Sequence, residues 1–358
     1  MPREATSGAN EHLTGLRLGA LGAYLSKHGM ALDPAHLPER FAAGFGNMNF
    51  LVKINGTSYV LRRPPHGPIP PGANDMAREF RIISHLNPVF PLVPRGQHFC
   101  GDTNVIGAPF LLMEYRPGLV IGANIPTDVT STWHCNQPLG QVLGRHLIGV
   151  LADLHAVDAG ACGLGNLGKP DGFLERTMRG WAKRAVLSWD DLPNDFAALL
   201  RWLAANRPPE TDAPTLIHND FKLDNIILDP GTFAPRTLID WDMGTIGDPL
   251  FDLAILLSYW TEATDPEAMH LLEQMPTAQH GFPTREEAAM LYARATGRDL
   301  GTFTFYRVLA MLRLAVVFQQ LFRRYQSGSS TDPKFARFDE LARGLLSFGL
   351  AVSRGETF

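Results

Sequence analysis

The chain has 358 residues, of which 45% are hydrophobic and 19% are charged, and its formal net charge is -4. This length permits two compact units with separate cores, and the slightly acidic balance argues against whole-chain attraction to nucleic acid or to an anionic membrane. The three cysteines are widely spaced, so they offer neither a disulfide framework nor a Cys-x-x-Cys metal clamp. No apolar run approaches the ~18 residues of a membrane span. We therefore expect a soluble, cytoplasmic protein that acts on a small molecule.

The N-terminal third of the chain alternates between helical and β-type patterns. Leucines at helical spacing predict a leading helix over residues 13–28. Apolar runs on either side of an Asn-Gly pair predict a β-hairpin over residues 50–61. A proline-rich loop, residues 64–72, precedes a helix with a polar N-cap over residues 76–86. A buried strand over residues 109–115 ends this part of the chain.

A Pro-Gly break at 116–118 is the predicted boundary between an N-terminal part, residues 1–117, and a mainly helical part, residues 118–358. Residues 119–138 are irregular, and they fit either an ordinary surface loop or a lid over substrate. Apolar residues at helical spacing over residues 139–154 then predict a helix that lies in the core.

Two short polar segments in the second part carry the candidate chemistry. His218 and Asp220 follow a β-type run, Asn225 lies five residues after Asp220, and a later β-type run ends in Asp240. The run Ile226-Ile-Leu228 and the later run are separated by a predicted turn at Asp229-Pro-Gly231, and a hairpin built this way would bring Asp220, Asn225 and Asp240 to one end of the paired strands. Asp220 then suits a base that takes the proton of a hydroxyl acceptor. The oxygens of Asn225 and Asp240 suit Mg²⁺ bound to the phosphates of ATP, so the pattern predicts phosphoryl transfer.

These motifs have the spacing of a known family. The pattern His-x-Asp-x-x-x-x-Asn at 218–225, with Ile-Asp-Trp at 239–241 and Gly-Asp-Pro at 247–249, resembles the aminoglycoside phosphotransferase family and its choline-kinase-like relatives. More closely, the sequence Tyr-Val-Leu-Arg-Arg-Pro-Pro at 59–65 resembles the kinase domain of this family that is joined to, or encoded with, acyl-CoA dehydrogenases. The resemblance covers roughly residues 41–259 and implies a functional link to such a dehydrogenase.

The resemblance implies an α+β fold of the two-lobed protein-kinase type. Residues 1–117 would form the leading helix and a nucleotide-binding lobe, with a small antiparallel sheet and one main helix. Residues 118–358 would form a larger, mostly helical lobe. This second lobe would hold the catalytic loop, residues 215–242, and the helices that bind the acceptor.

The resemblance also implies roles for individual residues. Asp220 would be the catalytic base, and Asn225 and Asp240 would bind Mg²⁺. His218 and Asp252 would order the catalytic loop rather than transfer protons. The residues that would bind ATP lie in a glycine-containing loop, at a basic position with its helix partner, and in a hinge: Gly44, Gly46, Asn47, Arg62, Glu79, Met113, Glu114 and Tyr115.

Two features depart from the family pattern. Kinases place a lysine where this chain has Arg62, which keeps the charge but not the compact shape of an ammonium group. The loop over residues 44–49 is not Gly-x-Gly-x-x-Gly, so its cover over the phosphates would depend on backbone donors and Asn47. A nucleotide-binding pseudokinase therefore stays open as a second interpretation, and a metal-dependent phosphoesterase as a third. Asp224 and Asp242, beside the proposed ligands, are expected to face solvent or to cap turns.

Charge indicates the class of acceptor. Over residues 301–358, eight Lys or Arg residues stand against four Asp or Glu residues, an excess of positive charge that suits an anion better than a polycation. Arg179, Trp181 and Lys183, together with Arg184, fit a solvated helix face, or alternatively an anion-binding patch for the substrate. The expected acceptor is a hydroxyacyl-CoA or a hydroxy acid, and an acceptor of aminoglycoside or choline type is the alternative.

Overall fold

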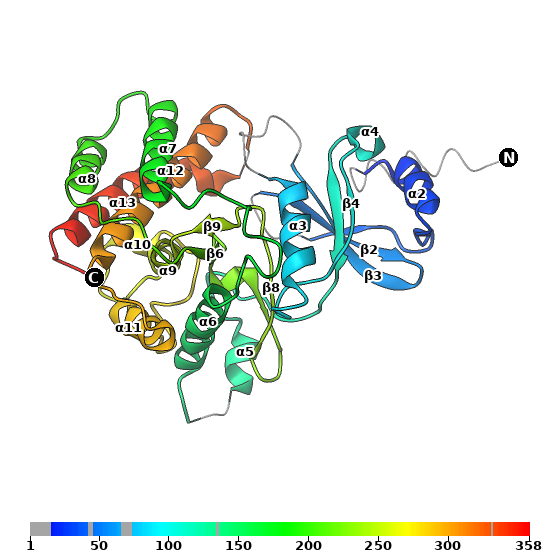
Figure 1. Ribbon diagram of the computed structural model, residues 1–358, viewed down its shortest axis with the longest axis horizontal. Coiled ribbons are helices and arrows are strands. Elements are labelled where there is room, and N and C mark those ends of the chain that lie inside the picture. Colours follow the sequence, from blue (N-terminus) through cyan, green and yellow to red (C-terminus); the bar gives the residue numbers. More distant parts are fainter. Residues whose placement is uncertain (1–15, 42–45, 66–73, 134–135, 331) are drawn as a thin grey trace. The chain divides into compact units, whose positions relative to one another are not determined.

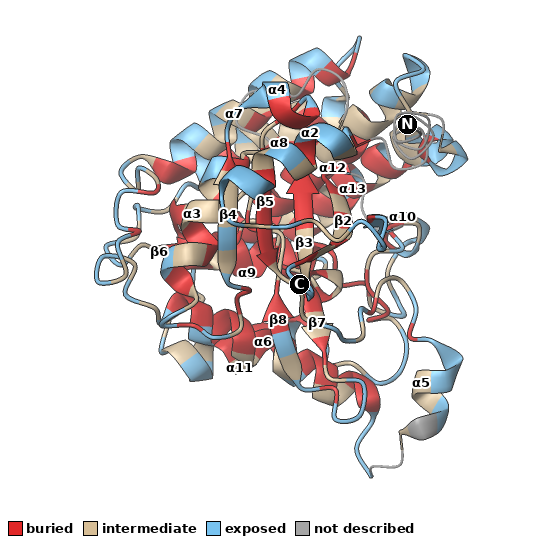
Figure 2. Cartoon of the chain, turned by 90° about the vertical axis from the view of Figure 1, so that its right-hand side faces the viewer, coloured by how far each residue is buried: buried red, intermediate tan, exposed pale blue. Residues whose placement is uncertain are grey.

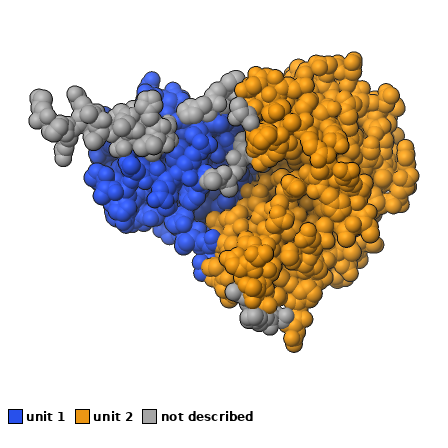
Figure 3. Space-filling model, turned by 180° about the vertical axis from the view of Figure 1, so that it is seen from behind, with its two compact units in different colours: residues 1–118, 236–244 blue, residues 119–235, 245–358 orange. Residues whose placement is uncertain are grey.

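Contacts within the chain divide it into two compact units, which Figure 3 shows in blue and orange. The computed structural model describes all residues except 1–15, 42–45, 66–73, 134–135 and 331. The first unit contains residues 1–118 and 236–244, and the second contains residues 119–235 and 245–358. The predicted division after residue 117 did not include the return of 236–244 to the first unit. This return places Asp240 in the first unit.

An antiparallel five-stranded sheet forms the centre of the first unit (Figure 1). In spatial order its strands are β1 (Glu39–Arg40), β2 (Met48–Ile54), β3 (Thr57–Arg63), β5 (Phe110–Glu114) and β4 (Gly96–Cys100). The predicted hairpin is β2 and β3, and Asn55 and Gly56 have the positive φ values, 51° and 79°, that its two-residue turn requires. Figure 2 shows that β5 is largely buried and that its neighbour β4 is more exposed. The edge strand β1 is exposed.

Helix α3 (Met76–Leu86) packs against β4 and β5 in the first unit. The Asp75 side chain caps it by accepting a hydrogen bond of 3.0 Å from the Arg78 amide, as the polar N-cap in the sequence predicts. The apolar face of α3 is buried, and the same face carries the carboxylate of Glu79 into the interior. A buried charged group needs a partner, and Arg62 of β3 is the partner of Glu79.

The leading helix is α2 (Leu18–Lys27), and it contacts the short α4 (Thr103–Ile106). It begins later than residue 13, where the sequence predicts its start, and residues 13–15 lie outside the described part. The helix ends before His28 and Gly29, and Gly29 has a φ of 73°. This left-handed conformation favours glycine and explains why the helix stops there.

Helices dominate the second unit. They are α5 (Thr127–Thr132), α6 (Leu139–His155), α7 (Phe173–Ser188), α8 (Asn194–Ala205), α9 (Pro249–Ser258), α10 (Glu267–His270), α11 (Arg285–Thr296), α12 (Phe303–Gln326) and α13 (Phe338–Ser353), with the 3₁₀ turns η1 (Leu223–Asn225) and η2 (Pro333–Arg337). The predicted core helix is α6, whose apolar face is buried. Helix α12 packs against α13, α9 and α7, so it lies at the centre of this unit.

Short strands frame the predicted catalytic loop. Strand β6 (Thr215–Ile217) pairs antiparallel with β9 (Thr245–Gly247), a strand that the sequence analysis did not identify. Strand β7 (Ile226–Leu228) leads into the predicted turn, where the Asp229 amide donates 2.8 Å to the Ala234 carbonyl. Strand β8 (Pro235–Leu238) begins after this turn. The chain therefore reverses direction between β7 and β8, as the Asp-Pro-Gly text predicts.

The described part of the segment 119–138 contains regular structure, although its sequence reads as an irregular loop. It contains α5, and the Leu119 and Leu228 backbones exchange two hydrogen bonds of 2.9 and 2.8 Å. Ile121 and Ile125 are buried. The segment is thus anchored by main-chain bonds and apolar contacts at its N-terminal end, and closure of this segment over substrate stays a prediction.

Helix α12 is the one helix in the described part of the chain that is long and apolar enough to cross a membrane. However, 78% of its apolar window is buried inside the unit. Burial of this kind is what a central helix of a globular unit shows, so packing accounts for the composition of α12.

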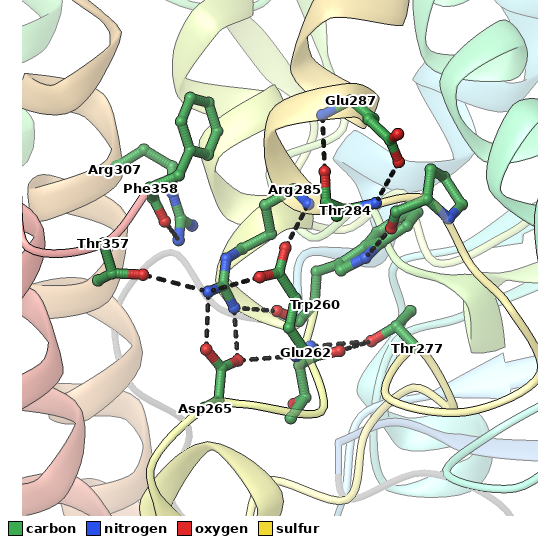
Figure 4. A network of polar contacts seen from close by, with 12 residues as sticks. Trp260, Glu262, Asp265, Thr277, Thr284, Arg285, Glu287, Arg307, Thr357 and Phe358 are labelled. Atoms are coloured by element: carbon green, nitrogen blue, oxygen red, sulfur yellow. Dashed lines mark hydrogen bonds and ion pairs between the residues drawn. The ribbon is translucent and has the colours of Figure 1, made fainter.

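Arg285, at the start of α11, is buried in a network of polar contacts within the second unit, one of which is a 3.5 Å contact to the Thr357 hydroxyl (Figure 4). Arg285 donates two hydrogen bonds, of 2.5 and 2.7 Å, to Asp265 and one of 2.9 Å to the Trp260 carbonyl. Its Nη2 lies 3.4 Å from Glu262. Arg307 donates 3.1 Å to the Phe358 carbonyl in the same region. Burial and the neighbouring Arg285 charge lower the pKa of Arg307 to about 9.

Candidate active site

Arg62 is the centre of a buried polar network in the first unit. It lies on β3 opposite Asn49 of β2, and its Nη1 donates 3.2 Å to the Asn49 side chain. Its Nε donates a hydrogen bond of 2.7 Å to Glu79 on α3, and its Nη2 donates a hydrogen bond to Oδ1 of Asp240. Burial opposes the charge of Arg62, but Asp240, Glu79 and Asp242 together raise its pKa above the ordinary value. The guanidinium therefore stays charged and joins a strand, a helix and the Asp240 segment.

Asp240 has an unusual backbone conformation. Its φ is 70°, which is uncommon for a residue with a side chain and is often found at functional positions. The next residue, Trp241, is fully buried and donates from Nε1 to the Leu238 carbonyl at 3.0 Å. The Asp240 carboxylate is 35% exposed. The segment is thus fixed by its tryptophan while the Asp240 carboxylate stays accessible to a cation from solvent.

Asp242 is not the solvent-facing residue that the sequence analysis predicts. Its Oδ2 accepts a hydrogen bond of 3.0 Å from Asn47, whose own Oδ1 accepts 2.8 Å from Asn74. Burial, followed by the charges of Asp240 and Glu79, raises the pKa of Asp242 to about 8. The prediction failed because alternation along an extended chain does not apply next to the left-handed backbone of Asp240.

The predicted catalytic loop is held by Asp252 in the second unit. Asp252 lies fully buried on α9, and its two carboxylate oxygens accept the backbone amides of His218 and Asn219, each at 2.7 Å. His155 of α6 lies 3.3 Å from the same carboxylate and 2.7 Å from the Tyr292 hydroxyl. Burial opposes ionisation, but the bonds from His155 and His218 hold the pKa of Asp252 below its ordinary value. This arrangement is what a loop-ordering residue requires.

The Asp220 carboxylate lies beside two residues that sequence reasoning missed. The Tyr259 hydroxyl donates 3.0 Å to Oδ1 of Asp220, and Nη2 of Arg313 lies 3.8 Å from the same oxygen. The Arg313 Nη2 also donates 2.8 Å to the Asn219 carbonyl. Asp220 itself is partly exposed, with 22% of its side chain accessible. The carboxylate is therefore oriented by its neighbours yet accessible from solvent.

Asn225 lies at the end of η1, where its side chain closes the loop. Its Nδ2 donates 2.8 Å to the Asp220 carbonyl, so that its amide oxygen is the atom that a metal ion would meet. Asn225 and Asp240 fit Mg²⁺ in donor type, since this ion prefers oxygen and needs few protein ligands. Within the described ranges, no group of three or more His, Cys, Asp or Glu side chains could hold a metal. The tight cluster that a phosphoesterase would need is not among those residues.

Lys222 is a further charged residue of the loop. Its Nζ lies 2.8 Å from Asp224, which is therefore paired rather than simply solvent-facing, and 5.7 Å from the centre of the Tyr259 ring. Burial opposes the charge of Lys222, but Asp220 and Asp224 raise its pKa above the ordinary value. Lys222 lies inside the motif at 218–225, so the sequence alone could have identified it as a candidate site residue. Tyr259 and Arg313 carry no such local signal.

The other residues predicted for nucleotide binding lie in the first unit. Met113 and Glu114 end β5, and the Glu114 carboxylate accepts bonds of 3.1 Å from the Arg95 amide and 2.9 Å from Arg116. The Tyr115 ring stacks on Phe41, with 6.2 Å between ring centres. Gly46 lies close to the Asn74 side chain, and Gly44 lies outside the described residues.

The residues predicted for acceptor binding on α7 separate into two groups. Arg179 is 70% exposed and pairs with Glu175, and Lys183 is also exposed, as the solvated-face interpretation predicts. Trp181 is instead buried, and the guanidinium groups of Arg184 and Arg313 lie over its ring. Of the predicted three, only Trp181 is thus connected to the surroundings of Asp220.

The two halves of the predicted site belong to different units. Arg62, Glu79 and Asp240 lie together in the first unit, and Asp220 and Asn225 lie together in the second. Joint binding of one Mg²⁺ ion by Asn225 and Asp240 stays a prediction.

Comparison with known proteins identifies related chains. The profile of the APH group, described as the phosphotransferase enzyme family, matches residues 38–291. Acyl-CoA dehydrogenase family member 11 of Gallus gallus is 29% identical over 355 residues, which cover 95% of this chain and 44% of that protein. Family member 10 of Mus musculus is 28% identical over 322 residues, which cover 88% of this chain and 29% of that protein. The chain thus spans less than half the length of these relatives.

Solved structures share the fold. A crystal structure from Ralstonia eutropha, provisionally named an aminoglycoside phosphotransferase, is 26% identical, with a TM-score of 0.75 and coverage of 95% of this chain and 99% of that one. A variant of the aminoglycoside phosphotransferase APH(4)-Ia, solved with ADP and hygromycin B, is 17% identical, with a TM-score of 0.55 and coverage of 91% and 98%. The predicted α+β fold of the kinase-like type is confirmed.

Proposed function

This chain belongs to the phosphotransferase enzyme family, and we propose that it transfers the γ-phosphate of ATP to a hydroxyl group of a small, anionic or acyl-type acceptor. The observation that carries this proposal is the Asp220 carboxylate, partly exposed and held at Oδ1 by the Tyr259 hydroxyl on a loop fixed by Asp252. A carboxylate of this kind can accept the proton of an attacking hydroxyl, as phosphoryl transfer requires.

The proposed reaction assigns a role to each of these residues. The acceptor oxygen attacks the γ-phosphorus as its proton passes to Asp220, the bond from that phosphorus to the bridging oxygen breaks, and ADP leaves with the bonding pair. Mg²⁺ would neutralise charge on the phosphate oxygens, and Asn225 and Asp240 are the residues that would hold it. Arg62, kept in place by Glu79, would contact the phosphates, and Met113, Glu114 and Tyr115 would contact adenine.

The contacts of Arg62 favour an active kinase over a pseudokinase. A kinase needs its basic residue paired with the helix glutamate, and the buried bond of 2.7 Å between Arg62 and Glu79 is such a pair. Arginine supplies separate nitrogens to Glu79 and Asp240, which one ammonium group does less well. Binding of ATP with no transfer to any acceptor would support the pseudokinase instead.

The acceptor class is proposed from charge and from the relatives. Arg313 next to Asp220 favours an anion over a polycation such as an aminoglycoside or over choline. The names of the relatives, acyl-CoA dehydrogenase family members 10 and 11, favour acyl-type hydroxyl compounds and a functional link to such a dehydrogenase. We accordingly propose hydroxyacyl-CoAs or hydroxy acids as acceptors and the cytoplasm as the place of action.

A transfer assay tests this function. Purified protein, ATP and Mg²⁺ are incubated with hydroxyacyl-CoAs, hydroxy acids, choline and kanamycin, and ADP and the phosphorylated product are measured. We expect turnover of an acyl or acid acceptor and a loss of at least about 100-fold in kcat for Asp220→Asn. Exclusive turnover of kanamycin would contradict the acceptor class, and full activity of Asp220→Asn would contradict the mechanism.

A further inference from the structure

A cluster of one tryptophan and two arginines adjoins Asp220 in the second unit: Trp181 and Arg184 on α7, and Arg313 on α12. Arg313 connects this cluster to the proposed base, because its Nη2 lies 3.8 Å from Oδ1 of Asp220. The Arg313 guanidinium also lies over the Trp181 ring, 5.5 Å from its centre, and the Arg184 guanidinium lies 4.5 Å from the same centre. A chain of contacts thus leads from the proposed base to Arg184.

The fold holds this cluster in position. Trp181 and Arg313 are buried, at 7% and 3% exposure, and α7 packs against α12. The bond from Arg313 to the Asn219 carbonyl connects the cluster to the loop that carries Asp220. Arg184 is only partly buried, in contrast to Arg313. Of the two arginines, Arg184 is therefore the more exposed, and Arg313 and Trp181 lie between it and Asp220 in this series of contacts.

Arg184 differs from other arginines on the surface of this unit. Arg179, on the same helix, pairs with Glu175 at 3.4 Å, and Arg323 pairs with Asp190 at 2.5 Å. Across the residues that the structure describes, no Asp or Glu lies within ion-pair distance of Arg184. Burial, and then the nearby charge of Arg313, lower the pKa of Arg184. Two positive groups on one indole ring repel each other, and an anion bound beside them would remove that repulsion.

We infer that Trp181, Arg184 and Arg313 form the subsite for the negatively charged group of the acceptor, a carboxylate or a phosphate, while the acceptor hydroxyl lies at Asp220. This inference rests on the proposed function, because it takes Asp220 as the base. Arg184 binds the anion through its planar fork, and Trp181 keeps that fork in place. The subsite selects a compact acceptor that carries both a hydroxyl and an anion, and it rejects cations by charge repulsion.

Paired acceptors test the subsite during turnover. A short hydroxy acid and its methyl ester share the hydroxyl but differ in charge, and they are assayed with the wild type, Arg184→Ala and Arg179→Ala. We expect Arg184→Ala to raise KM for the acid about tenfold or more, because one charge-assisted pair is lost. KM for ATP and for the ester should stay within about twofold, and Arg179→Ala should match the wild type. An equal effect on acid and ester, or no effect, would overturn the inference.

Binding without turnover separates this inference from the proposed function. The hydroxy acid is titrated calorimetrically into the wild type, Asp220→Asn and the double variant Asp220→Asn with Arg184→Ala. Binding to Asp220→Asn that is lost in the double variant supports the subsite even where no phosphate transfer is detected, and in that case only the proposed function fails. Equal binding to the two variants, or none to the wild type and Asp220→Asn, would show that the subsite is wrong.

Discussion

The Tyr259 hydroxyl donates a hydrogen bond of 3.0 Å to Oδ1 of Asp220, and the two residues lie 39 positions apart in the sequence. Tyr259 follows α9 directly, the helix that also carries Asp252. One helix and the residue that follows it therefore position both the backbone of the proposed catalytic loop and the carboxylate of its proposed base. Burial, and then the Asp220 charge, raise the pKa of the Tyr259 hydroxyl, so it stays a donor at neutral pH.

Removal of this donor should impair catalysis more than binding. Tyr259→Phe keeps the buried ring but leaves Asp220 free to rotate, so we predict a fall in kcat of about tenfold with KM for ATP unchanged. Steady-state kinetics measure both quantities. Tyr325→Phe, on the last turn of α12, is the matched control and should behave as the wild type. Normal kcat for Tyr259→Phe would mean that the hydroxyl does not orient the base.

Arg62 should not be replaceable by the lysine of other kinases without a cost. Its guanidinium binds Glu79 through Nε and Asp240 through Nη2, and a lysine cannot reproduce this fork. We predict that Arg62→Lys raises KM for ATP several-fold, whereas Arg62→Ala lowers the free energy of unfolding by about 3 kcal/mol, because Glu79 stays buried without its partner. Kinetics and chemical denaturation measure the two effects. An exposed arginine of the same sheet serves as the control in Arg40→Ala.

The Asp252 interactions predict a defined dependence of stability on pH. Because the pKa of Asp252 is lowered in the folded state, the ionised form adds stability above the ordinary value of 3.8, and this stability is lost as the pH falls below it. Asp252→Asn places an amide against two backbone donors, so we predict that the free energy of unfolding falls by about 2–3 kcal/mol at pH 7. The difference from the wild type should shrink toward pH 3 in denaturation experiments. A constant difference at every pH, or an equal loss in the exposed Asp171→Asn control, would contradict this account.

The buried Arg285 should contribute to folding and not to chemistry. Its removal leaves Asp265 buried without its partner, so Arg285→Ala should lower the free energy of unfolding by about 3–5 kcal/mol. The double variant Arg285→Ala with Asp265→Ala should lose less than the sum of the two single variants. Denaturation curves measure these energies, and kcat of the folded fraction should match the wild type. Strict additivity would show that the pair does not act as a unit.

The sequence by itself determined the fold class through the family resemblance that its motifs carry, and it predicted the reaction class. The motif at 218–225, the segment ending at Asp240 and the Asn-Gly hairpin are local patterns, in which residue type and spacing fix backbone geometry over a few residues. A hydrogen-bonded turn or a helix cap depends on neighbours along the chain, so it can be predicted from those neighbours.

Only the tertiary structure decided which distant side chains meet these motifs. Tyr259 and Arg313 reach Asp220 from helices far along the chain, and Trp181, not Arg179 or Lys183, belongs to the same cluster. Asp242 is half-buried and accepts a hydrogen bond from Asn47, next to the positive φ of Asp240 in the first unit. Such contacts depend on helix packing and on the path of the chain, which no local pattern encodes. The motif proposed for phosphoryl transfer is therefore local, whereas the charge that surrounds its proposed base is set by packing.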